Sequence, residues 1–133
     1  MLTITKDFAF DASHSLRNPK WSREINEETY GKCINLHGHT YKLSVTLEGT
    51  EENGMIINFS KLKEIVNREI IEKFDHQNLN NFYALPTCEI MVKDIFMRLR
   101  LFLNGLNYRL KRVDLYEQIY PTNSYASYES SNI

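Results

Sequence analysis

The chain has 133 residues, of which 42% are hydrophobic and 25% charged, and its formal net charge is −1. This length fits a single domain with a modest core. The near-neutral charge argues against a broad basic surface for nucleic acid, although a local cluster of Lys and Arg would be enough to bind an anionic small molecule. No apolar run approaches the length of a transmembrane helix, so we expect no membrane partner.

The first residues have neither the basic start nor the apolar core of a signal peptide, and we therefore expect a cytoplasmic protein. The only two cysteines, Cys33 and Cys88, do not form a disulfide framework. In a reducing cytoplasm Cys33 remains a thiol that is available for chemistry.

Residues 2–14 alternate between apolar and polar side chains, which predicts a half-buried strand. The apolar members share one parity: Leu2, Ile4, Phe8, Phe10 and Ala12. His14 ends the strand on the same parity. A histidine there is either an ordinary core residue or a metal ligand. Residues 15–32 follow as a long connection that has room for a short helical piece, and a connection of this length is usually functional or mobile.

Two histidines, His37 and His39, flank Gly38 at the start of a second alternating segment, residues 39–48. Residues i and i+2 of a strand point to the same face, so the two imidazoles would lie side by side. Cys33 has the same parity and would reach that face if the strand began early. Antiparallel pairing of the two strands would bring His14 to His37. Three imidazoles with an open fourth position are typical of catalytic zinc.

The middle of the chain predicts a turn at 51–54 and then a helix that Ser60 caps and that runs through Phe74. Asp75 and His76 follow directly. An Asp-His pair in a loop is often only solvated, but here it places the fourth histidine beside a carboxylate.

A second helix is predicted from a cap at Thr87 to about Leu103, and its apolar stripe consists of Val92, Ile95, Phe96, Leu99 and Leu106. Residues 109–119 form a third strand, in which Glu117 shares a parity with Val113, Leu115 and Ile119. A carboxylate on an apolar face is costly unless it is paired or binds a ligand.

Residues 124–128 form a last strand, and we expect the tail 130–133 to be frayed. The predicted order is β-β-α-α-β-β. This is an α+β fold in which two helices cover one face of a four-stranded antiparallel sheet, with residues 1–133 as one domain.

Five segments together resemble the 6-pyruvoyltetrahydropterin synthase family, which includes 6-carboxytetrahydropterin synthases. They occur in the order and spacing of that family and cover nearly the whole chain: 10–14, 33–39, 75–76, 86–89 and 115–117. The Cys-x-x-x-His-x-His segment with the upstream His and the downstream Asp-His is specific as a set. The resemblance implies a T-fold that assembles as a homohexamer, a dimer of trimers with active sites at subunit interfaces.

The resemblance also implies a role for individual residues. Zinc would bind to His14, His37 and His39. Cys33 would be the proton-abstracting base, with Asp75 and His76 of a neighbouring subunit as its proton relay. The pterin ring would be held by Glu117, which also belongs to the catalytic set, together with Thr87 and Glu89.

The implied substrate is 7,8-dihydroneopterin triphosphate. The reaction would be that of a zinc-dependent 6-carboxy-5,6,7,8-tetrahydropterin synthase, which forms acetaldehyde and triphosphate and feeds queuosine biosynthesis. Three positions depart from the family pattern: Asn58 (usually Asp), Ile90 (commonly Asn) and Gln118 (commonly Thr).

Two alternatives stay open. The chain could be a 6-pyruvoyltetrahydropterin synthase, which eliminates triphosphate without cleaving a carbon–carbon bond. It could also be a non-catalytic domain whose zinc is structural, in which case Cys33 would close the site as a fourth ligand. A cupin-type oxygenase is rejected, because the first acid after His39 is Glu48. Candidates for binding the phosphates are Lys20, Arg23, Lys32 and Lys42.

Overall fold

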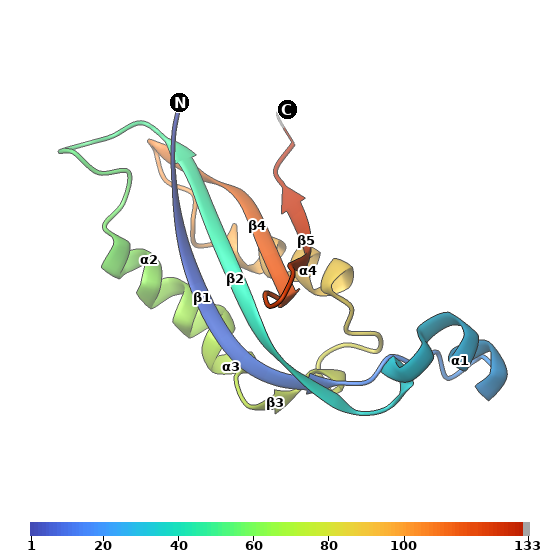
Figure 1. The fold of residues 1–133 in the computed structure, drawn as a ribbon. Coiled ribbons are helices and arrows are strands. Elements are labelled where there is room, and N and C mark those ends of the chain that lie inside the picture. The colour runs from blue at the N-terminus through green and yellow to red at the C-terminus, as the bar shows by residue number, and fades with distance from the viewer. Residues whose placement is uncertain (132–133) are drawn as a thin grey trace.

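A computed structural model describes residues 1–131; the last two residues of the predicted frayed tail lie outside this range. Two long strands, β1 (Leu2–His14) and β2 (His37–Gly49), form the antiparallel centre of the sheet. They are followed in space by β4 (Tyr108–Gln118) and β5 (Ser124–Glu129), both antiparallel to their neighbours. Figure 1 shows the helices that follow β2 in the chain on one side of this sheet.

The predicted α+β class is confirmed, but the sheet has five strands rather than four. The additional strand, β3 (Gln77–Asn78), pairs with Ala12 and Ser13 of β1 and runs parallel to it. Two residues are too few to show an alternating pattern, so this strand could not be predicted from periodicity.

The helix that was predicted to run through Phe74 is built in three pieces. It comprises α2 (Phe59–Val66), a π-helical turn (Asn67–Ile71) and α3 (Glu72–Phe74). The cap is Asn58, whose side chain accepts a hydrogen bond from the backbone N–H of Ser60; the prediction of Ser60 as the cap was wrong. Both residue types cap helices well, and Asn58 comes first.

The second helix, α4 (Cys88–Leu99), is capped by Thr87 as predicted. It ends four residues earlier than predicted, in a turn that still buries Leu103. Leu106 was wrongly included in the apolar stripe, because it lies past this turn and is fully exposed.

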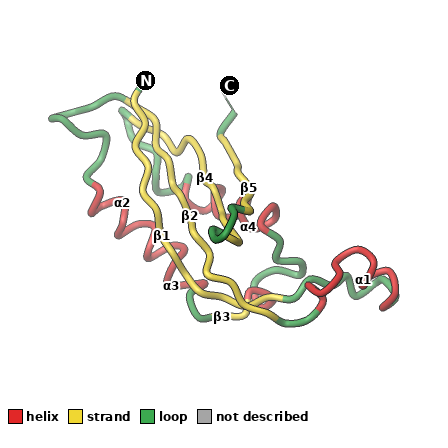
Figure 2. The backbone as a smooth tube through the Cα atoms, viewed as in Figure 1, coloured by secondary structure: helices red, strands yellow, loops and turns green. Residues whose placement is uncertain are grey.

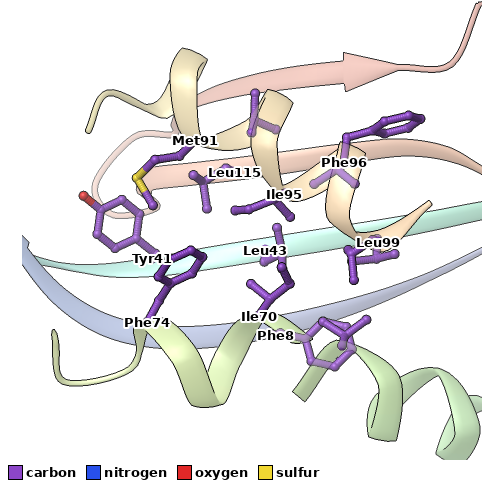
Figure 3. Close-up of a cluster of buried hydrophobic side chains, with 14 of the residues drawn as sticks. Phe8, Tyr41, Leu43, Ile70, Phe74, Met91, Ile95, Phe96, Leu99 and Leu115 are labelled. Atoms are coloured by element: carbon purple, nitrogen blue, oxygen red, sulfur yellow. The ribbon is translucent and has the colours of Figure 1, made fainter. Parts of the chain in front are cut away.

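The core lies between the sheet and these helices. In Figure 3 the side chains of Tyr41, Leu43 and Leu115 from the sheet meet those of Phe74 and Met91 from the helices. Strands β1 and β2 carry their apolar residues on the parity that the sequence predicted, and the same face leads directly into the histidines.

The long connection between β1 and β2 forms a separate lobe, residues 15–36, that contains α1 (Arg23–Tyr30) and a short 3₁₀ helix (Gly31–Ile34). The predicted short helical piece is therefore present. Figures 1 and 2 show the lobe beyond the ends of β1 and β2, away from α2, α3 and α4.

Candidate metal centre and active site

Three histidines gather at one end of the sheet, as the strand pairing predicted. His14 lies opposite His37 in the β1–β2 ladder, and Ala12 lies opposite His39. All three imidazoles continue the core face, and His14 is only 1% exposed. Metal-binding atoms of His14, His37, His39 and Glu117 all lie within 4.8 Å of one another.

Backbone carbonyls determine which ring nitrogens of two histidines are available. The carbonyl of Pro86 lies 2.8 Å from Nδ1 of His14, and that of Asn35 lies 2.7 Å from Nδ1 of His37. Because a carbonyl can only accept a hydrogen bond, both Nδ1 atoms carry the proton. The Nε2 atoms therefore present lone pairs, and they face each other at 3.0 Å. Two lone pairs this close require a cation, either a proton or a metal ion.

The third histidine strengthens this argument. Among the described residues, Nε2 of His39 is buried and has no hydrogen-bond partner. It lies 2.9 Å from Oε1 of Glu117 without the alignment that a hydrogen bond needs. A buried polar atom without a partner is costly and needs an explanation, and a bound ion is one such explanation. The three Nε2 atoms fit a zinc ion in their donor type and number.

Glu117 supplies the negative charge of this cluster. Its Oε1 lies 3.2 Å from Nε2 of His14, and this contact together with the neighbouring imidazoles lowers the pKa of Glu117. Burial disfavours the His14 imidazolium, but Glu117 and the Pro86 carbonyl outweigh burial and raise the pKa of His14. Burial lowers the pKa of His39. The sequence pattern placed Glu117 correctly, whereas Ile119 lies beyond the end of β4 and is exposed.

Asp75 and His76 form a second cluster on the opposite face of the sheet. Oδ2 of Asp75 lies 3.0 Å from Nδ1 of His76, and the backbone N–H of Asp11 donates to Oδ1 of Asp75. The hydrogen bond from Asp11 is the main cause, and the contact with His76 the next, of a lowered pKa of Asp75. Asp11 alternates with the core residues Phe10 and Ala12, so this pair and the groove beside it lie behind the sheet, away from His14.

Cys33 lies in the 3₁₀ helix of the lobe and is half-buried. The prediction that an early strand would carry it to the histidine face was wrong, because β2 begins only at His37. Its sulfur is not among the atoms that converge in the metal cluster of the described residues. The backbone N–H of Leu16 donates to its carbonyl at 2.8 Å, which holds the Cys33 segment close to the end of β1.

The remaining predicted residues lie around the start of α4. Thr87 is the cap of that helix, and Glu89 is exposed in its first turn. Sequence reasoning missed Pro86 and Asn35, because a backbone carbonyl leaves no signal in the residue type. It also missed Asp11, which joins the Asp75–His76 cluster. Lys42, one of the phosphate candidates, lies on the back face and contacts the ring of Tyr116.

Comparison with known proteins now identifies the family. A profile described as 6-pyruvoyl tetrahydropterin synthase matches residues 3–131. The chain belongs to this family. A tetrahydropterin synthase fold of this type is also seen in 6-pyruvoyl tetrahydropterin synthase of Caenorhabditis elegans, whose structure matches with a TM-score of 0.83 and 28% identity over 98% of this chain and 96% of that one.

Relatives in the 6-pyruvoyl tetrahydropterin synthase family bear different names. The chain is 45% identical over 80 residues to 6-pyruvoyl tetrahydrobiopterin synthase of Dictyostelium discoideum, a match that spans 59% of that protein. It is 35% identical to dihydroneopterin monophosphate aldolase of Pyrococcus furiosus over 82% of this chain and 83% of the relative. It is 31% identical to 6-carboxy-5,6,7,8-tetrahydropterin synthase of Bacillus subtilis, over 94% of this chain and 83% of the relative.

No helix in the described range is long and apolar enough to cross a membrane.

Proposed function

We propose that the protein is a cytoplasmic, zinc-dependent lyase, a 6-carboxy-5,6,7,8-tetrahydropterin synthase that acts in queuosine biosynthesis. Its substrate would be 7,8-dihydroneopterin triphosphate, and its products 6-carboxytetrahydropterin, acetaldehyde and triphosphate. The observation that carries the proposal is the set of three converging Nε2 atoms, two of which belong to imidazoles whose Nδ1 atoms are bonded to backbone carbonyls, in a chain that belongs to this family.

His14, His37 and His39 would hold the zinc ion. When bound, zinc supplies a positive charge that acidifies hydroxyl groups beside it and stabilises developing negative charge on the substrate. The names of the relatives given above refer to pterins. We propose that the carboxylate of Glu117 holds the pterin ring. Its lowered pKa keeps it ionised at neutral pH, so it accepts hydrogen bonds from the ring N–H groups. Thr87 and Glu89 at the start of α4 would complete this end of the site.

Cys33 is the base we propose, because its sulfur lies outside the metal cluster but its segment is tied to the end of β1. A thiol works as a base once its surroundings favour the thiolate. A protonated His76 would supply such surroundings, with Asp75 orienting its imidazole. Since Asp75 and His76 lie behind the sheet, they would serve Cys33 of a neighbouring copy in a homohexamer.

The test is to incubate the purified protein with dihydroneopterin triphosphate and identify the products. Acetaldehyde together with a carboxypterin supports the proposal. A pyruvoyl pterin without acetaldehyde would instead support 6-pyruvoyltetrahydropterin synthase activity, which relatives with that name also favour. Zinc-loaded protein without any turnover would overturn both, and would favour a non-catalytic zinc domain.

A further inference from the structure

The lobe is a built structure rather than a loose loop. Asn26 is its centre, since it is only 1% exposed although it carries an amide. Its Oδ1 accepts a hydrogen bond from the backbone N–H of Asn18 at 2.8 Å, and its Nδ2 donates to the carbonyls of Asn18 and Ser22. A buried amide with its bonds satisfied fixes the chain around it.

A cavity of about 210 Å³ opens inside this lobe. It is lined by Arg17, Arg23, Asn26, Ile34 and Asn35. Two residues of its lining are connected to the candidate active site through the backbone. Asn35 also accepts the hydrogen bond from His37, and Arg17 follows Leu16, which is bonded to Cys33.

The cationic side chains of this cavity are not fully neutralised. Within residues 1–131, Arg17 makes no ion pair or side-chain hydrogen bond, while Arg23 pairs with Glu27 at 2.8 Å on the exposed face of α1. The lobe carries four cationic residues against three acidic ones, a net charge of +1 in a chain whose net charge is −1. Guanidinium groups suit phosphate oxygens because they donate two hydrogen bonds in one plane.

We propose that this cavity is the subsite for the phosphate ester of the pterin substrate, with Arg17 and Arg23 as its cationic contacts. The proposal rests on the function proposed above and adds Arg17, which sequence reasoning did not consider. The order of groups along the molecule supports it. Glu117 lies on β4, the histidines lie at the ends of β1 and β2, and the lobe continues beyond those ends. A pterin whose ring contacts Glu117 and whose side chain crosses the metal would direct its phosphate to the lobe.

The test uses pterins that bind without reacting. Neopterin, neopterin monophosphate and neopterin triphosphate are titrated into the zinc-loaded protein, and pterin fluorescence reports binding. We expect a phosphate to tighten binding to the unaltered protein by about tenfold or more, the scale of one good charged contact. In Arg17→Ala this gain should disappear, while the affinity for neopterin and the zinc content stay unchanged.

Two variants serve as controls. Arg17→Lys keeps the charge but not the planar pair of donors, so part of the gain should remain. Arg100→Ala removes the same charge at the end of α4, outside the lobe, and should keep the whole gain. An Arg17→Ala protein that still prefers the phosphorylated pterins as strongly as the unaltered protein would overturn the proposal.

The design separates this proposal from the proposed function. If phosphate improves binding through Arg17 but no product forms from dihydroneopterin triphosphate, the subsite stands and the function fails. If none of the three pterins binds, titration with orthophosphate of the unaltered protein and of Arg17→Ala still tests the cavity, and equal affinities overturn it. A gain that is complete with the monophosphate indicates a cavity for a single phosphate, and a further gain with the triphosphate indicates that it holds the longer chain.

Discussion

Backbone carbonyls determine which ring nitrogen of two histidines carries the proton, and therefore which nitrogen can bind a metal. Because Pro86 and Asn35 hold Nδ1 of His14 and His37, only Nε2 can bind a metal. We expect His14→Ala, His37→Ala and His39→Ala each to lower the zinc content of the purified protein to a small fraction, measured by mass spectrometry of the metal. The control is His76→Ala, which lies on the other face and should keep its zinc. Loss of zinc in that variant would show that our division between ligands and relay is wrong.

A substitution of Cys33 distinguishes its two possible roles, general base and metal ligand. As a base outside the metal cluster it can be removed without loss of zinc. We expect Cys33→Ala to keep its metal and its oligomeric state and to lose turnover by about a hundredfold or more, the scale of a lost general base. Cys88→Ala is the matched control and should lose little activity. A Cys33→Ala protein without zinc would make Cys33 a ligand and exclude the catalytic scheme.

Cys88 itself should be unreactive in the folded chain. It is 8% exposed, and burial raises the pKa of its thiol to about 12, above the usual value of about 8.5. Between these two values the unfolded state binds fewer protons than the folded state, so this thiol makes stability fall as the pH rises above about 8.5. Iodoacetamide at pH 8.5 should modify Cys88 only after denaturation, and Cys88→Ala should reduce the alkaline loss of stability. Equal labelling rates before and after denaturation would contradict this.

At the scale of the elements, the cap of α2 explains one departure from the family pattern. Asn58 accepts the N–H of Ser60, a role that Asp fills equally well. Asn58→Ala should cost about 1 kcal/mol of stability, whereas Asn58→Asp should cost almost nothing. Thermal unfolding at one fixed protein concentration measures both. Ser60→Ala is the control; if it destabilises as much as Asn58→Ala, the cap has been misidentified.

An element of the fold could be predicted from the sequence where its pattern of apolar and polar residues repeats over several residues. β1 and β2 are thirteen residues long and alternate over much of that length, so residues such as Phe8, Phe10 and Leu43 reveal the pattern, and the pairing of the strand ends follows. β3 exists only because Gln77 and Asn78 meet β1 in space. The π-helical turn likewise depends on packing, since its residues are ordinary helix formers.

The residues of the candidate site also fall into two groups, those that could be placed from the sequence and those that could not. His14, His37, His39 and Glu117 lie on strands, where parity determines the face, and they were placed together correctly. Cys33 lies four residues before β2, and parity carries no information outside a strand. Arg17 belongs to the lobe, where only the folded chain brings it beside Arg23.

At the scale of the whole molecule, both edges of the sheet are open within the described chain. β5 is the outermost strand on one side. On the other side β3 pairs only with Ala12 and Ser13, and Asp75 and His76 bond the backbone of Asp11, so β1 from Leu2 to Phe10 pairs only with β2. Long open edges pair with other strands unless they are blocked. Pairing β1 of one copy with β5 of the next would close the sheets into a ring and resolve both edges at once.

Such a ring agrees with the homohexamer that the family resemblance implies, and light scattering at micromolar concentration measures the mass of the assembly. A sharper test follows from the two faces of the sheet, because His76 and the histidine cluster of one chain belong to two separate groups of side chains. If Cys33 of one copy works with His76 of its neighbour, Cys33→Ala and His76→Ala are each inactive alone, but hexamers co-expressed from both contain some complete sites. With random assembly about a quarter of the sites would pair an intact Cys33 with an intact His76, so up to about a quarter of the normal turnover should return.

The control combines Cys33→Ala with the double variant Cys33→Ala, His76→Ala, in which no site is complete. A monomeric mass would contradict the assembly, and mixed hexamers without any recovered activity would mean that Cys33 and His76 do not come from different copies.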